Sequence, residues 1–273
     1  MNDSRPSLSI IVDVTNPGQF FACCGLLELA HRLWPGAGGW FENGQFMICA
    51  ECGGITLRQV SEWLQNCELI PDDPKADDKT CPLRLRQHAV DDDGGSLAMR
   101  LDWWLDDTGV GGLLKTWAGQ QRVKVIARAM LHSAIADGHA DKGWLDRGRT
   151  ASLPELPGKV VEPFYFDARR FAHALDTGFS LDVQGVETVA HPAVELLCLI
   201  GLQRFRPRQS SESKWAFEYW TWPQPLSAPV AAAVACGAAN MPGRKGYRFS
   251  LRFRDDQKRY KAFDFAIPIG GDT

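Results

Sequence analysis

The chain has 273 residues, of which 45% are hydrophobic, and a formal net charge of −3. This length and composition are typical of a globular protein with a sizeable core, organised as one large domain or two modest ones. The sequence has no apolar run of about 18 residues, the length a membrane helix needs, and its first residues lack the pattern of a signal peptide. We therefore exclude a membrane protein and expect a cytoplasmic one.

Charge is distributed unevenly along the chain. Residues 72–107 contain ten Asp against five Lys or Arg, a local charge of −5, and residues 204–264 contain twelve Lys or Arg against five acids, a local charge of +7. This split predicts two different faces, one of them able to bind a polyanion, with ordinary solubility as the alternative. Aromatic residues alternate with the C-terminal basic residues, a combination typical of proteins that bind unpaired nucleic acid.

The strongest local pattern is a β-branched run over 8–14 followed at once by a helical pattern over 17–34. Asn16 is suited to cap this helix, Pro17 to occupy its first position, and Gln19 to reach back in a capping box. The free N–H groups beside Gly18 offer a place for an anion. A capped junction with a purely structural role is the alternative.

Further elements are predicted up to residue 104: strands near 39–41 and 45–51, a helix over 56–66 and a strand over 97–104. With the first strand and helix, these give the order β-α-β-β-α-β of the ferredoxin-like or RRM-like arrangement, in which two helices cover one face of a sheet. Segment 67–96 is rich in Asp, Gly and Pro, and we expect it to be an exposed acidic insertion. Residues 1–150 are thus predicted to form an RRM-like α+β region.

A second helix of interest is predicted over 120–137, ending at Gly138. Its polar side is basic and several glycines precede it, which favours a flexible loop and a helix that approach nucleic acid. A solvated helix face behind a glycine-rich linker is the alternative. The candidate nucleic-acid-binding residues of this part are Lys115, Gln120, Gln121, Lys124 and Arg128.

Residues 151–273 are predicted to form a basic α+β region: a strand over 160–166, a helix from 192 to about 206, a strand over 214–222, a helix over 228–236 and a C-terminal antiparallel hairpin over 247–267. Alternation over 247–254 places the aromatic residues and Leu251 inward and the arginines outward together. Segment 243–246 (GRKG) is a basic turn whose backbone can approach a phosphate. The candidate nucleic-acid-binding residues here are Arg206, Arg208, Arg244, Lys245, Arg248, Arg252 and Arg254.

Metal and catalytic motifs are weak in this sequence. Cys49 and Cys52, with Cys67 and Cys81 downstream, suggest a four-thiolate zinc site, but a second Cys-x-x-Cys pair is missing. Paired aspartates, such as those at 106 and 107, are the residues that hold Mg²⁺ in nucleases, yet most of the pairs lie in polar, glycine-rich sequence typical of loops. We therefore expect a non-catalytic protein without a metal or cofactor.

Three motifs, at residues 16–30 (NPGQFFACCGLLELA), 101–107 (LDWWLDD) and 114–121 (LKTWAGQQ), resemble a family of small CRISPR-associated proteins from type I-U (I-G) loci. That family is proposed to supply the large-subunit equivalent of a Cascade-like, RNA-guided DNA surveillance complex. The resemblance implies contacts with target DNA or guide RNA near the short motif beside the target (PAM), with other Cascade subunits and with a recruited helicase-nuclease, but not with a membrane.

Three other functions stay open at this point. One is a backbone-type subunit whose RRM-like core grips guide RNA. The second is a carboxylate-dependent nuclease. The third is a structural adaptor whose basic face meets an acidic protein.

Overall fold

The computed structural model describes residues 6–51, 54–73, 79–88, 98–109, 111–156, 158–170, 189–254 and 257–270. Its helices are α1 (Pro17–Leu33), α2 (Leu57–Gln65), α3 (Val123–Ile135), α5 (Pro192–Gly201) and α6 (Ala228–Ala235), with 3-10 turns η1 (Trp144–Asp146) and η2 (Ala168–Arg170). Its strands are β1 (Leu8–Ile11), β2 (Gly38–Glu42), β3 (Gln45–Cys49), β4 (Cys67–Pro71), β5 (Leu83–Gln87), β6 (Ala98–Leu101), β7 (Arg208–Gln209), β8 (Ala216–Thr221), β9 (Lys245–Phe253), β10 (Lys261–Phe263) and β11 (Ile267–Ile269).

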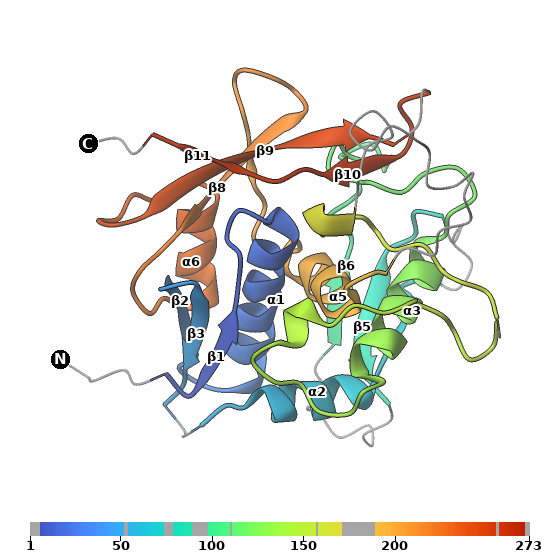
Figure 1. Ribbon diagram of the computed structural model, residues 1–273, viewed down its shortest axis with the longest axis horizontal. Helices are drawn as coiled ribbons and strands as arrows, with labels where there is room; N and C mark the ends of the chain where they lie inside the picture. The colour runs from blue at the N-terminus through green and yellow to red at the C-terminus, as the bar shows by residue number, and fades with distance from the viewer. Residues whose placement is uncertain are drawn as a thin grey trace.

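The described chain is a mixed α+β fold in which helices lie among small antiparallel sheets (Figure 1). Helix α1 is its centre, because every residue from Pro17 to Ala30 is buried, and a helix that is apolar on all sides has to be enclosed by other elements. None of the described helices has both the length and the apolar character needed to cross a bilayer.

The predicted cap of α1 is confirmed. The Oδ1 of Asn16 accepts a hydrogen bond of 3.1 Å from the backbone N–H of Gly18, and Pro17 occupies the first turn. The side chain of Gln19 bonds differently from the expected capping box, since its Oε1 accepts from the N–H of Asp13 at 2.7 Å. Gln19 thereby fixes the segment between β1 and α1 rather than the cap itself.

Helices α1 and α5 touch through glycine. A Cβ on Gly25 would lie 2.0 Å from the carbonyl oxygen of Leu197, and a Cβ on Gly201 would lie 2.1 Å from that of Phe21. Only glycine permits this approach of the two backbones. The α5 helix ends at Gly201, earlier than the predicted end near residue 206, and a turn over 201–205 follows it.

The first sheet has the order β1–β3–β2, and α1 follows β1. Asn43 and Gly44, with φ of 50° and 73°, form the tight turn between β2 and β3. The predicted fourth strand of an RRM-like sheet contains β6, which pairs instead with β5 in a separate sheet of order β4–β5–β6. The ferredoxin-like or RRM-like arrangement is therefore not confirmed.

The physical reason lies in segment 67–96, which is not simply an exposed acidic insertion. It contains β4 and β5, where Leu69, Leu83 and Leu85 are buried and alternate with charged residues. The outward arginines pair across the sheet, Arg86 with Glu68 on β4 and Arg84 with an aspartate after β4. These two strands supply β6 with a neighbouring antiparallel partner, whereas residues 74–78 and 89–97 of the segment lie outside the described residues.

The largest sheet has the order β7–β8–β9–β10, and β11 also pairs with β9. Figure 1 shows β9 running across one end of the molecule, with α1 and α6 beneath the sheet. Its inner face packs on α1, where the rings of Phe20 and Tyr219 stack with centroids 4.3 Å apart. The predicted inward positions Tyr247, Phe249 and Leu251 are buried.

Two sequence predictions for the C-terminal half need correction. Residues 160–166 do not form a regular strand: Val160 makes an isolated bridge with Ser152, and the segment after it buries Phe164 and Phe166 without forming a strand. The predicted return strand of the hairpin is divided into β10 and β11, which pair with different parts of β9.

Candidate nucleic-acid interface

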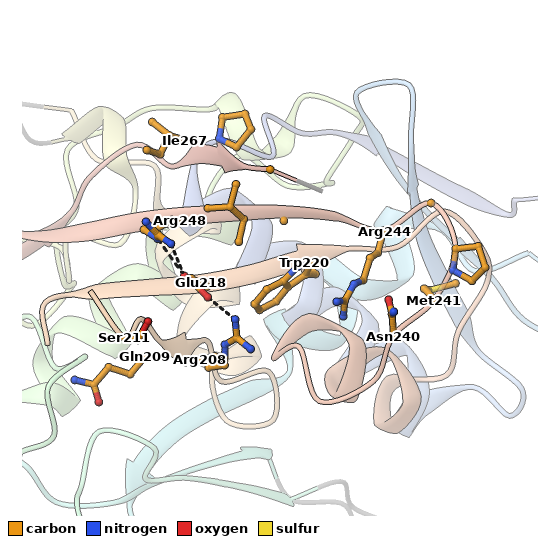
Figure 2. Close-up of a pocket in the computed structure, with 16 residues that line it drawn as sticks. Arg208, Gln209, Ser211, Glu218, Trp220, Asn240, Met241, Arg244, Arg248 and Ile267 are labelled. Atoms are coloured by element: carbon orange, nitrogen blue, oxygen red, sulfur yellow. Dashed lines mark hydrogen bonds and ion pairs between the residues drawn. The ribbon is translucent and has the colours of Figure 1, made fainter. Parts of the chain in front are cut away.

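A groove of about 1160 Å³ lies on the outer face of the largest sheet. Strand pairing builds its floor, because Arg208, Glu218, Arg248 and Ile267 stand opposite one another on β7, β8, β9 and β11. The loop from Asn240 to Arg244 closes one end of the groove, as Figure 2 shows.

One carboxylate holds two arginines in this floor. Glu218 Oε2 accepts from Nη2 of Arg208 at 2.6 Å, and Glu218 Oε1 accepts from Nη2 and Nε of Arg248 at 2.9 and 3.1 Å. Burial alone would raise the pKa of Glu218, but the hydrogen bonds from Arg208 and Arg248 hold it below its ordinary value. The hydrogen bonds that Arg248 donates to Glu218 and Glu212 raise the pKa of Arg248. The carboxylate of Glu218 and the guanidinium of Arg248 are thus charged at neutral pH.

The aromatic member of the groove is Trp220. The guanidinium carbons of Arg208 and Arg244 lie 4.6 and 5.4 Å from the centroid of its ring, and Figure 2 shows the indole between these two side chains. Gly246 makes this position possible, because a Cβ there would lie 2.7 Å from the indole Nε1. Arg244 is also anchored, since its Nη1 donates to the carbonyl oxygen of Ala239 at 2.9 Å.

The opposite side of the groove is apolar. Ile267 is 64% exposed, which makes it the most exposed large hydrophobic side chain in the described part of the chain. Pro268 and Ile269 on β11 and Met241 in the closing loop also line the groove. The groove therefore offers cationic and apolar surface side by side.

Three of the predicted basic residues, Arg208, Arg244 and Arg248, line this groove together. Lys245 is exposed and lies beside it, since its neighbours in the chain, Arg244 and Gly246, are lining residues. Arg206 is exposed after α5 and is not one of the lining residues.

The predicted row of outward arginines on β9 is not a free cationic ridge. Arg248 is paired with Glu218, and Nε of Arg252 lies 2.5 Å from Oδ2 of Asp264. The guanidinium carbon of Arg254 lies 3.2 Å from the centroid of the Tyr165 ring. The alternation was predicted correctly, but acidic and aromatic residues from other segments engage the arginines.

The candidates of the α3 region lie elsewhere. Lys115 is half-buried, and its Nζ donates to the carbonyl oxygen of Trp117 at 2.8 Å, so burial lowers its pKa and it does not project freely. Gln120 is exposed, whereas Gln121 accepts from the N–H of Ala118 at 3.3 Å. Lys124 and Arg128 line a smaller groove of about 460 Å³ between α3 and β4, where Arg128 pairs with an exposed glutamate.

The candidate metal ligands do not gather among the described residues, which contain no group of three His, Cys, Asp or Glu arranged to hold an ion. Cys67 is buried, which raises its pKa to about 12, and Cys52 lies outside the described residues. Asp102 pairs with Arg100 and accepts from the amide of Gln203 at 3.0 Å. Such partners hold a loop in place.

Sequence reasoning missed a buried polar cluster at the start of α1. Asp167 accepts from the amide of Asn16 at 2.7 Å, from the guanidinium of Arg169 at 2.8 Å, and lies 3.0 Å from Nδ1 of His191. Burial would raise the pKa of Asp167, but bonds from His191 and Arg169 hold it well below its ordinary value. A carboxylate of the chain itself, Asp167, thus lies at the start of α1, bound to the side chain of the capping Asn16. The repeated helix start, Asn16-Pro17 and His191-Pro192, was the available signal.

Comparisons of this chain with protein-family models, with curated proteins and with solved structures find no match. The functional assignment consequently depends on the geometry of the groove and on the three sequence motifs.

Proposed function

We propose that this chain is a non-catalytic subunit that contacts nucleic acid, within the type I-U (I-G) CRISPR surveillance complex that its motifs resemble. The observation that carries the nucleic-acid contact is the meeting of Arg208, Arg244 and Arg248 around Trp220 in one groove. The three motifs support the choice of system.

The charges of the groove favour a polyanion. Three arginines line it, and two carboxylates, Glu218 and Glu212, pair with them, so an excess of positive charge is left for phosphates. Arginine presents planar, bidentate donors that match phosphate oxygens, and its binding to phosphates releases counterions from the nucleic acid. The exposed Lys245 at the edge adds to this attraction.

The backbone-type alternative would use the sheet of β1, β3 and β2. The order β-α-β-β in residues 8–49 supports a partial likeness to an RRM, which we retain only as a proposal. However, these three strands contain no lysine or arginine. Their outer face lacks the cations that phosphates need, and we therefore favour the groove.

The proposal is tested by fluorescence anisotropy with labelled single-stranded and duplex oligonucleotides over a range of salt concentrations. Replacing Arg208, Arg244 and Arg248 together with Gln should weaken binding and reduce the slope of log K against log salt on single strands, by about 0.7 for each phosphate contact that is lost. Arg252→Gln is the matched control on the same strand and should leave the slope unchanged. A triple variant that stays folded and binds like the wild type would overturn the proposal.

A further inference from the structure

We propose that the groove takes an unpaired stretch of nucleic acid and that Arg208 is the platform on which one of its bases stacks. This inference depends on the proposed function and adds the kind of nucleic acid that the groove selects. It is built on the geometry of Arg208, on the exposed apolar wall and on the register of the sheet.

The guanidinium of Arg208 is held in place without being covered. Its carbon lies over the ring of Trp220, 4.6 Å from the centroid, and its Nη2 is fixed by Glu218 at 2.6 Å. The side chain still has 54% of its surface exposed. A planar cation that is held in place and still exposed is a surface on which unpaired bases can stack.

The other two arginines of the groove are engaged differently. Arg248 is bound to Glu212 and Glu218 and only 24% of its side chain is exposed, so it fixes the floor. Arg244 lies at the closing loop next to the exposed Lys245. Arg244 and Lys245 are therefore placed to contact the phosphates that flank a base on Arg208.

The apolar side of the groove, formed by Ile267 and its neighbours on β11, favours a single strand over a duplex. Ile267 is 64% exposed and stands opposite Arg248 in the sheet, so it faces the same groove as Arg208. Ile267 and Arg208 are three strand spacings apart, or about 14 Å, since neighbouring strands lie about 4.8 Å apart. A duplex presents phosphates and base edges and keeps its base faces stacked inside, whereas an unpaired strand can place a base face against Ile267.

The test compares oligonucleotides of equal length: oligo-dT, oligo-U, a duplex, and a strand whose bases are replaced by abasic sites. The wild type should bind oligo-dT or oligo-U at least about 10-fold more tightly than the duplex or the abasic strand. Arg208→Lys keeps the charge but removes the planar face. It should weaken binding to the base-bearing strand about 5- to 100-fold, with an unchanged salt slope and unchanged binding to the abasic strand.

Arg206→Lys is the matched control, because Arg206 is exposed two residues away and does not line the groove, and it should bind like the wild type. Ile267→Ser, at an exposed position, should weaken binding to the base-bearing strand alone. The inference would be overturned if Arg208→Lys lost the same affinity for base-bearing and abasic strands, or lost no affinity at all. A wild type that preferred the duplex would overturn it as well. In each of these cases the triple Gln variant can still lose its salt slope, which would leave the proposed function standing.

Discussion

The side-chain amide of Asn16 donates a 2.7 Å hydrogen bond to the carboxylate of Asp167, and it joins two fully buried residues that lie 151 positions apart in the sequence. This bond ties the start of α1 to the segment that also receives His191 and Arg169. Two halves of the chain thus meet at one buried charge, and the consequences can be measured.

Asp167→Asn should lower the free energy of unfolding by about 3 kcal/mol or more, because it removes the buried carboxylate that pairs with Arg169 and contacts His191, and the other partner of Arg169, Asp146, is half-exposed. Urea unfolding monitored by circular dichroism gives this value. Asp141→Asn is the control, since Asp141 is largely exposed in its pair with Arg147, and it should cost less than about 1 kcal/mol. Equal effects of the two variants would contradict the structural role of Asp167.

The same carboxylate predicts a pH dependence of stability. The pKa of Asp167 is lower in the folded state than its value of about 3.9 in the unfolded chain, so the folded state binds fewer protons below about pH 5. Stability from this group is therefore present at neutral pH, begins to be lost below about pH 5, and goes on being lost below pH 4 toward the lower folded pKa. The difference in unfolding free energy between wild type and Asp167→Asn, measured from pH 6 to pH 3, should shrink with acidification. A constant difference would refute this explanation.

Lys261 predicts a second pH dependence of stability, in the alkaline range. Burial, and then the charge of Lys115, lower its pKa to about 8, against about 10.4 in the unfolded chain. Between these values the unfolded state binds more protons, so this lysine destabilises the fold at neutral pH and does so less as the pH rises to 10. The free energy of unfolding of the wild type, minus that of Lys261→Met, should therefore increase from pH 7.5 to pH 10. A flat or falling difference would show that Lys261 titrates normally.

Gly25→Ala tests the contact of α1 with α5. Its Cβ would lie 2.0 Å from the carbonyl oxygen of Leu197, so the helices must separate, at a cost of about 3 kcal/mol. Gly112→Ala is the control, because a Cβ there would meet its nearest atom at an ordinary 3.5 Å. Thermal melting of both variants measures the difference, and an unchanged melting temperature for Gly25→Ala would contradict the close packing.

The proposed absence of catalysis is tested by incubating the protein with DNA and RNA in Mg²⁺ or Mn²⁺. Asp102 is engaged by Arg100 and Gln203, and catalysis would need carboxylates that converge on a metal. We expect the substrates to stay intact. Cleavage that disappears in Asp102→Asn would favour the nuclease instead.

Local patterns carried most of the correct sequence predictions. The cap at Asn16 and the alternation from Tyr247 to Leu251 depend only on near neighbours in the chain, and both are present. The partner of β6 was missed because β4 and β5 lie in an acidic segment whose short alternation resembles a loop.

In the candidate site, too, contacts between segments that are distant in the sequence could not be predicted. Basic residues such as Arg208 and Arg248 were identifiable by charge, but their sharing of Glu218 depends on strand register, which the sequence does not reveal. Trp220 was missed although the inward positions Phe217 and Tyr219 place it on the opposite face of β8. The residues of β8 that alternate with its predicted core residues were therefore the signal in the sequence for the groove.

The most direct test of the proposed nucleic-acid contact is a cryo-EM map of the proposed surveillance complex, assembled with this chain and bound to target DNA. The account predicts nucleic-acid density in the groove between Arg208, Arg244 and Ile267, with an unpaired base on the guanidinium of Arg208. A groove filled by another protein subunit, or open to solvent with all nucleic acid elsewhere, would contradict it.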